Sequence, residues 1–317
     1  MISAQNLYKW YGNKLVVDGI SFSVSTGEVL GFIGPNGAGK STTMRMITGF
    51  IPPSQGSASI GSHSMTDSPL EAKAMLGYLP ENAPLYGGMT VREFLRFSAE
   101  IRGLRGQELK SRVDTVVELC FLEQVWNQNI DTLSKGYRHR TCFAQAIIHD
   151  PPALVLDEPT DGLDPNQKRE IRKLIAEMGK SKAILLSTHI LEEVEAVCTR
   201  VAIIHCGKKV FDGSPGTLKS RSASAGAVVL TVARRPVPEI NTKLEALPGS
   251  PLVTLIEESE TDATMKIFPK APQSGFELSG EVFKLARDEA WQVTDFHIED
   301  GRLDEIFHSM TQSGGPT

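Results

Sequence analysis

The sequence has few cysteines, and their spacing does not suit cross-linking. The four thiols show no CxxC motif and lie within apolar segments, at Cys120, Cys142, Cys198 and Cys206. This pattern is typical neither of a disulfide-stabilised secreted domain nor of a zinc site. We expect four buried thiols in a reducing compartment.

An excess of positive charge is also lacking. The chain has 33 lysine and arginine residues against 38 acidic residues, which gives a formal net charge of −5 and a pI of about 5.9. A protein with this balance has no strong electrostatic attraction to the phosphate backbone of nucleic acids. We therefore expect no nucleic-acid partner.

Long apolar runs are missing as well, and we expect no secretion leader. No apolar run approaches the roughly 20 residues that cross a bilayer. The N-terminal segment MISAQNLYKW lacks a basic start followed by an apolar stretch. We expect a cytoplasmic protein, unless something anchors it to a membrane.

The sequence does contain enough apolar residues for two packed domains. Its 317 residues are 40% apolar, and this length exceeds that of a typical single domain. Over residues 1–215, short β-rich runs such as EVLGFI, ALVLDE and AILLST alternate with helical patterns. This alternation predicts an α/β domain with a mostly parallel sheet and helices on both faces.

A helical insert is predicted within this domain, at about residues 85–150. Apolar residues recur there at intervals of three and four, with Thr90 or Ser111 as candidate N-caps. Residues 216–226 are rich in glycine and serine and are predicted to form a linker.

A second domain is predicted over residues 227–317. The patterns follow the order β-α-β-β-α-β, and the segment RLDEIFHSMT adds a last helix. That order is typical of a small α+β domain of the ferredoxin-like type. It shows no catalytic constellation, so we expect a regulatory or docking role.

The stretch GPNGAGKST, residues 34–42, matches the pattern GxxxxGK[ST] between a predicted strand and a predicted helix. Gly34, Gly37 and Gly39 let backbone N–H groups converge on an anion, and the positive end of the helix points to the same place. Lys40 would reach the β- and γ-phosphates, and the Ser41 hydroxyl would bind Mg²⁺. The stretch predicts a nucleotide site, which a kinase, a GTPase or an ATPase could use.

Two acids follow a later predicted strand in PALVLDEPTDGLDP, residues 152–165. Asp157 at the strand end would lie beside the bound metal. Glu158, one residue further on, could polarise a water for in-line attack on the γ-phosphate. We predict that this pair is the hydrolytic half of the site.

His189 ends another apolar strand, in AILLSTHILEEVE. A histidine there could bind a γ-phosphate oxygen or the attacking water, although a packed core histidine is the alternative. In the segment DTLSKGY, Ser134 precedes a helix expected to begin near Gly136, which predicts a second anion cradle. Two chains facing head to tail would let each cradle close over the nucleotide of the other.

With these motifs in this order, residues 2–215 resemble the ATP-binding cassette (ABC) ATPases. The resemblance implies a P-loop NTPase core with a helical subdomain, ATP and Mg²⁺ as ligands, and a homodimer that closes around two ATP molecules. It implies catalytic roles for Glu158, His189 and Lys40, and metal ligation by Ser41, Asp157 and Glu81. The nucleotide-binding residues that it implies are Tyr11, Gly34, Asn36, Gly37, Ala38, Gly39, Lys40, Ser41, Thr42, Ser134, Gly136 and Asp164. Among these, Tyr11 would stack on adenine, and the loop with Asp164 would couple the two sites.

The chain departs from the family pattern at two places. The usual LSGGQ is LSKGY here, with Lys135 and Tyr137 substituted. We expect an active variant, because the serine hydroxyl and the backbone donors survive and Lys135 adds a positive charge facing phosphate. Glu81 replaces a common glutamine; a carboxylate can bind Mg²⁺ but repels a triphosphate. Our hypothesis is that Glu81 still couples the site to a partner.

The segments GYLPE, LSKGY and RLDEIFHSMT are similar to ATPases that drive two-component exporter-type permeases for drugs, copper-enzyme maturation or gliding motility. In that group the ATPase is a separate chain, and a coupling helix of the membrane subunit enters a groove beside the helical insert. This resemblance places the groove along residues 81–92 and the chain at the cytoplasmic face of the inner membrane.

Three other functions are weighed against this one. A soluble cassette ATPase could act on ribosomes or DNA, but such relatives usually carry two cassettes or long coiled coils, and neither pattern occurs here. A P-loop kinase has no use for a second cradle. If ATP binding served only as a signal for assembly, no general base would be needed at Glu158.

Overall fold

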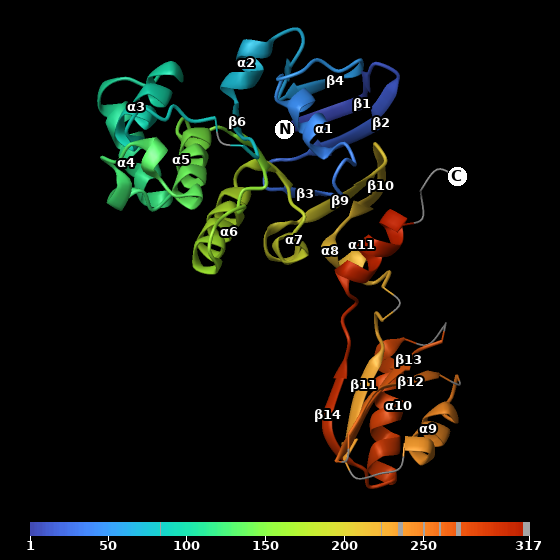
Figure 1. Cartoon of the computed structure of the whole chain (residues 1–317). Helices are drawn as coiled ribbons and strands as arrows, with labels where there is room; N and C mark the ends of the chain where they lie inside the picture. The colour runs from blue at the N-terminus through green and yellow to red at the C-terminus, as the bar shows by residue number, and fades with distance from the viewer. Residues whose placement is uncertain are drawn as a thin grey trace. The chain divides into compact units, whose positions relative to one another are not determined.

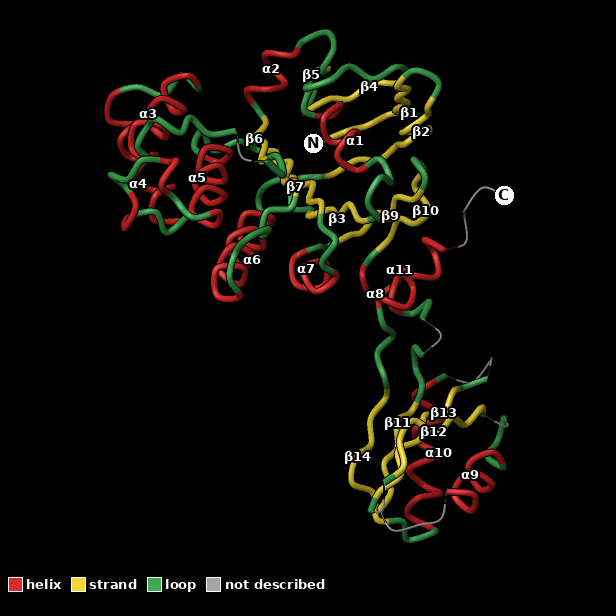
Figure 2. Tube along the Cα trace, in the orientation of Figure 1, coloured by secondary structure: helices red, strands yellow, loops and turns green. Residues whose placement is uncertain are grey.

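The computed structural model divides into two compact units (Figure 1; Figure 2). It describes residues 1–82, 84–222, 224–233, 237–249, 251–259, 261–270 and 274–312. The first unit contains Met1–Pro215 and the segment that begins at Met310, and Gly216–Ser309 forms the second. Residue 83 of the predicted groove, residue 223 of the predicted linker and the last five residues lie outside the described residues. Among the described residues, no helix combines the length and the apolar character that a membrane span requires.

The centre of the first unit is a six-stranded sheet. In spatial order its strands are β10 (Lys208–Gly213), β9 (Arg200–His205), β3 (Val29–Ile33), β8 (Ala183–Ser187), β7 (Ala153–Asp157) and β6 (Leu76–Leu79). Five strands run parallel, and β10 pairs antiparallel with β9 at one edge. β3, β7 and β8 are buried at every position, because both faces of the sheet are covered. The predicted α/β core is confirmed.

Helices cover both faces of this sheet. The helix α1 (Lys40–Ile47) contacts β7 on one side and the N-terminal strands on the other. The helices α6 (Pro165–Gly179) and α7 (Leu191–Val197) pack together on the opposite side of the sheet (Figure 1). Both α6 and α7 start just beyond strand ends that carry predicted site residues, so the fold brings those residues to one edge of the sheet.

A separate antiparallel sheet forms the N-terminal part of the unit. Its order is β2 (Lys14–Val24), β1 (Ile2–Tyr11), β4 (Gln55–Ile60) and β5 (His63–Ser64). Phe22 of β2 meets Phe32 of β3 with ring centroids 5.2 Å apart, so both sheets share one core. The sequence indicated strands here without showing that they form a second sheet. A short helix, α2 (Pro69–Ala74), follows β5.

The helical insert contains α3 (Val91–Ile101), α4 (Gly106–Leu119) and α5 (Lys135–Ile147), with short 3-10 turns at Glu123–Val125 and Ile130–Thr132. Thr90 caps α3 in a capping box with Glu93, as predicted. The predicted cap at Ser111 is wrong, because α4 already begins at Gly106 and Ser111 lies inside it.

The second unit is a ferredoxin-like α+β domain, as predicted. Its elements are β11 (Val228–Ala233), α9 (Val237–Glu245), β12 (Leu252–Glu258), β13 (Asp262–Phe268), α10 (Gly275–Asp288) and β14 (Gln292–Ile298). The sheet has the order β12-β13-β11-β14 with antiparallel pairing throughout. Its core includes Leu230, Met265 and Val282.

Two further helices border this domain, α8 (Pro215–Lys219) and α11 (Leu303–Gln312). Ser222 and Ser224, within the predicted linker, are buried and donate hydrogen bonds to Glu305 of α11 at 2.6 and 2.7 Å. This part of the linker segment is therefore packed rather than extended.

All four cysteines are free, and three are buried. The prediction that all four are buried is wrong for Cys206, which is exposed. Cys206 lies in the turn between β9 and β10 with φ +47°, so the turn and not the apolar strand decides its environment.

Candidate active site

A glycine loop connects the end of β3 to the start of α1. A Cβ at Gly34 would overlap the carbonyl oxygen of Ile204, and a Cβ at Gly39 (φ +105°) would lie 2.8 Å from that of Val16. Both positions require glycine, because neighbouring backbone occupies the space of a side chain. At Gly37 (φ +79°) no atom lies within 4 Å of an added Cβ, so the top of the loop is open. An anion there faces the positive end of α1.

Lys40 is the first residue of α1, and its side chain folds back over the loop. It is 8% exposed, and its ammonium donates a hydrogen bond to the carbonyl oxygen of Gly34 at 2.6 Å. Burial lowers the pKa of this lysine, whereas the carboxylates of Glu158, Asp157 and Glu81 raise it. The structure thus brings the predicted cation and the three predicted acids into one electrostatic environment.

Asp157 ends β7 and is 4% exposed. It lies opposite Ser187, the last residue of the parallel strand β8, and accepts a short hydrogen bond from the Ser187 hydroxyl. This bond fixes the carboxylate at the edge of the sheet where both strands end. The sequence analysis missed Ser187, because the contact depends on strands that are 30 residues apart.

Glu158 and His189 form a hydrogen-bonded pair next to Asp157. His189 Nδ1 lies 2.9 Å from Glu158 Oε2, and the Glu158 side chain is 15% exposed against 65% for His189. Burial raises the pKa of Glu158, and the hydrogen bond with His189 acts in the opposite direction. Glu158 also adopts φ +51°, a conformation that costs energy for a residue with a Cβ and often occurs at functional sites. The pair is a carboxylate with an exposed imidazole beside it.

Glu81 and Asp157 line one cavity of about 460 Å³. Tyr78, Arg45 and Gln145 contribute to the same wall. Burial and the Asp157 carboxylate raise the pKa of Tyr78 to about 12, so its hydroxyl stays protonated. The cavity therefore connects the predicted metal ligand Asp157 with the exposed residue Glu81.

Tyr11 is the last residue of β1 and is 49% exposed. The ammonium of Lys9 lies 5.6 Å from the centroid of its ring. The neighbouring Trp10 is stacked on Tyr8 instead, with ring centroids 5.5 Å apart and planes 9° from parallel. Of these aromatic side chains, Tyr11 has the ring surface available to a base.

Comparison with known proteins identifies the family. Residues 17–161 match the family model described as ABC transporter. The chain is 36% identical over 233 residues to the linearmycin resistance ATP-binding protein LnrL of Bacillus subtilis, with 73% of this chain and 75% of that protein covered. The chain belongs to the ATP-binding cassette family.

Two further comparisons agree with this membership. The chain is 34% identical over 274 residues to the Nod factor export ATP-binding protein I of Ralstonia nicotianae, with 86% and 83% of the two chains covered. A solved structure of an ATP binding subunit of an ABC transporter is 32% identical and has a TM-score of 0.65, with 69% of this chain and 92% of that chain covered.

The ABC chain is an ATPase that uses ATP and Mg²⁺, and the residues present fit these ligands. The loop offers open space at Gly37 and a buried cation at Lys40 for the phosphates. Mg²⁺ is usually held by one or two carboxylates together with substrate phosphates. Among the described residues no three His, Cys, Asp or Glu side chains form a group that could hold a metal ion by itself. Of the other predicted loop residues, Asn36 is exposed, Ala38 is buried, and Ser41 and Thr42 are partly exposed.

The predicted second cradle lies at the start of α5. Ser134 caps this helix, and its hydroxyl oxygen accepts a hydrogen bond from the Tyr137 N–H at 3.3 Å. Gly136 is buried, and a Cβ there would lie 3.0 Å from Gln167 of α6. Ser134 itself is exposed. The cradle thus faces solvent at the surface of the helical insert.

Lys135, whose positive charge is predicted to face phosphate, makes an ion pair within its own chain. Its ammonium lies 2.7 Å from Asp161, in the loop that follows Glu158. Asp164 ends the same loop and caps α6, where its carboxylate accepts a hydrogen bond from the Gln167 N–H at 2.9 Å. The cradle and the loop with Asp164 are therefore connected by an ion pair.

Proposed function

We propose that the chain is the ATP-hydrolysing subunit of an exporter-type ABC transporter, which drives a separate membrane permease. The observation that carries this proposal is an apolar groove beside the helical insert that shares its wall with the Asp157 cavity. The groove gives the hydrolytic site a physical connection to a partner.

The hydrolytic roles are assigned by position. Glu158 is the general base for the attacking water, and His189 beside it contacts the same water or a γ-phosphate oxygen. Lys40 neutralises phosphate charge. Ser41 and Asp157, with Glu81 at the rim, would hold Mg²⁺, which when bound neutralises charge that develops on the phosphates.

A second copy of the chain completes each site in this proposal. Ser134 and Gly136 lie on α5 of the helical insert, whereas Lys40 lies on α1 of the sheet core. The exposed cap at Ser134 can therefore serve the nucleotide of another copy. Closing on ATP and reopening after hydrolysis would move the permease.

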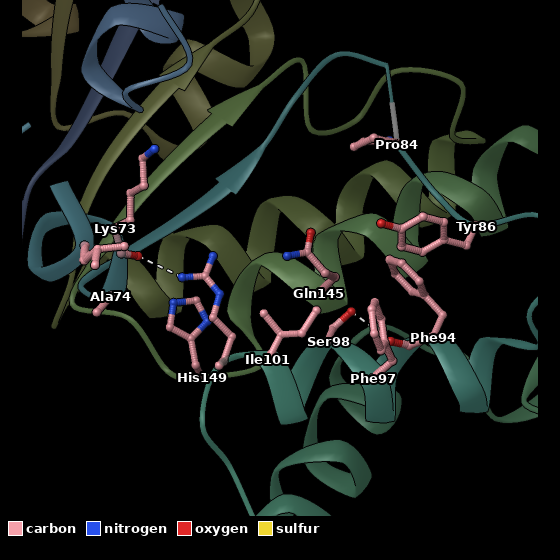
Figure 3. A pocket seen from close by; sticks show the side chains of 12 residues that line it. Lys73, Ala74, Pro84, Tyr86, Phe94, Phe97, Ser98, Ile101, Gln145 and His149 are labelled. Atoms are coloured by element: carbon pink, nitrogen blue, oxygen red, sulfur yellow. Dashed lines mark hydrogen bonds between the residues drawn. The ribbon is translucent and has the colours of Figure 1, made fainter.

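We infer that the groove, whose lining Figure 3 draws, takes a short apolar helix of that permease. Its volume is about 620 Å³, and Tyr86 lies edge-on to Phe94 and Phe97 in its wall, with ring centroids 6.1 and 5.8 Å away. Leu70 and Ile101 of the lining are 80% and 67% exposed. Exposed apolar side chains around a hollow are typical of a protein–protein docking site.

The groove and the Asp157 cavity have three lining residues in common, Pro84, Arg102 and Gln145. A helix inserted in the groove would displace or fix these side chains and so reach Glu81 and Asp157. This arrangement supports a peripheral location at the cytoplasmic face of the inner membrane. A soluble ABC ATPase with a non-membrane partner is the second candidate, because the same groove could hold another helix.

A groove variant tests the proposal. Tyr86→Ala should reduce the fraction of the protein that sediments with membranes of the native cell, because it removes the ring at the centre of the aromatic wall. Phe276→Ala is the matched control, since Phe276 is 81% exposed and lies in the second unit. Nucleotide binding of each variant would be measured to show that the site is intact. Equal membrane fractions for both variants would contradict the docking site.

A further inference from the structure

A buried carboxylate joins two loops of the active site. Glu193 of α7 is 1% exposed. Its Oε1 accepts a short hydrogen bond from the Thr160 hydroxyl, and its Oε2 accepts one from the Thr188 hydroxyl at 2.8 Å. Each carboxylate oxygen thus accepts a hydrogen bond from a different loop.

Each threonine lies close to a predicted catalytic residue in the chain. Thr160 follows Glu158 by two positions, and Thr188 directly precedes His189. Both threonines are buried, at 2% and 0% exposure. Because the β7–β8 ladder ends with Asp157 opposite Ser187, the residues beyond it depend on other contacts to keep their relative positions.

Both threonines also make a hydrogen bond within the turn of their own loop. The Thr188 oxygen also accepts a hydrogen bond from the Ile190 N–H at 3.0 Å, which closes the turn that carries His189. The Thr160 carbonyl accepts one from the Leu163 N–H at 3.3 Å, in the turn that leads to Asp164. A shift of either loop would therefore change the hydrogen bonds of Glu193.

The charge of Glu193 is balanced from α6. Arg172 Nη2 lies 3.5 Å from Glu193 Oε1, and the Arg172 side chain is 22% exposed. A buried carboxylate is costly unless it is paired and hydrogen-bonded, and both conditions hold here. An anion at this position can accept from both loops at once, which an apolar side chain cannot do.

We propose that Glu193 is a positioning residue, which holds His189 against Glu158 and links this pair to the loop that ends at Asp164. It contacts neither the nucleotide nor the water in this scheme and acts through Thr160 and Thr188. The inference rests on the proposed function for the roles of the catalytic pair and of Asp164. It adds a connection within one chain between the dimer-facing loop and the hydrolytic pair.

Threonine variants test this role in the purified full-length chain. Thr188→Val removes the hydroxyl at nearly constant volume, and Thr188→Ser keeps it. Glu192→Gln is the control, because the Glu192 carboxylate lies 3.9 Å from the same Arg172 Nη2 but its side chain is 85% exposed. Steady-state kcat and KM for MgATP and the thermal unfolding midpoint would be measured for each variant.

We expect Thr188→Val to lower kcat on the order of tenfold or more, because a small misplacement of a catalytic group has effects of that size. KM should stay within about twofold, and Thr188→Ser should recover most of the rate. In a His189→Ala background, Thr188→Val should have no further effect, because both changes interrupt the same connection. Glu192→Gln should match the unchanged protein.

Two results would overturn the proposal. One is an unchanged kcat in Thr188→Val. The other is an equal loss with and without His189, which would mean a general structural effect. If Thr188→Val does not fold, Thr160→Val on the other loop gives the same test in both backgrounds. A failure of the proposed function itself looks different, since the unmodified chain would then hydrolyse MgATP no faster than Glu158→Gln.

Discussion

Tyr11 offers a prediction whose size follows from the structure. The ring is 49% exposed at the end of β1, while Trp10 is already stacked on Tyr8. An aromatic side chain stacked on a nucleobase contributes about 1–3 kcal/mol, measured by substitution with alanine. Since 1.4 kcal/mol corresponds to tenfold in affinity, Tyr11→Ala should weaken ATP binding by about 5- to 150-fold.

The same reasoning predicts which ligands are unaffected. Stacking acts on the base and not on the phosphates, so the affinity for pyrophosphate should be unchanged in Tyr11→Ala. Tyr11→Phe should bind ATP nearly as well as the unmodified chain, because the ring is retained. Calorimetric titrations in a Glu158→Gln background would measure these affinities without turnover.

Two results would refute the role of Tyr11. ATP affinity within twofold of the unmodified chain would mean that the ring does not contact the base. An equal loss of affinity for ATP and pyrophosphate would mean that the substitution disturbs the loop rather than a stacking contact. Trp10→Ala provides the comparison for a neighbouring ring that lies against Tyr8.

Three further predictions concern the acids and the imidazole. Glu158→Gln should lower kcat by about 100- to 10,000-fold with MgATP binding retained, and a rate near normal in steady-state assays would exclude Glu158 as the base. Burial raises the pKa of Glu158 and the hydrogen bond with His189 lowers it, so His189→Ala should raise that pKa and move the acidic limb of the kcat–pH profile to higher pH. An acidic limb at the same pH in His189→Ala would argue against the interaction between Glu158 and His189. Glu81→Gln should change the coupling between the nucleotide site and the partner. Unchanged ATPase activity together with unchanged transport would contradict this role of Glu81.

The parts of the fold that follow from local patterns were predictable. The glycine loop, the acids at a strand end and the order β-α-β-β-α-β all lie in short contiguous stretches, so spacing alone reveals them. The capping box at Thr90 is local in the same way. The separate N-terminal sheet was not predictable, because the pairing of β1 with β4 joins segments about 50 residues apart.

Contacts between distant segments limit what the sequence says about the site. Ser187 holds Asp157 from a neighbouring strand, and Glu193 bonds Thr160, which lies 33 residues away in the sequence. Both residues lie in the stretch AILLSTHILEEVE that was singled out for His189, but nothing in its spacing indicates these contacts. The ion pair of Lys135 with Asp161 likewise joins segments that are 26 residues apart in the sequence.

The central claim is that this ATPase drives a membrane permease. The most direct measurement uses tagged Glu158→Gln, captured with MgATP from detergent-solubilised membranes of the native cell, followed by identification of the chains that co-purify. We expect a polytopic membrane subunit to co-purify, and we expect Tyr86→Ala in the same background to lose it. Capture of ribosomal proteins, of nucleic acid or of this chain alone would contradict the transporter assignment.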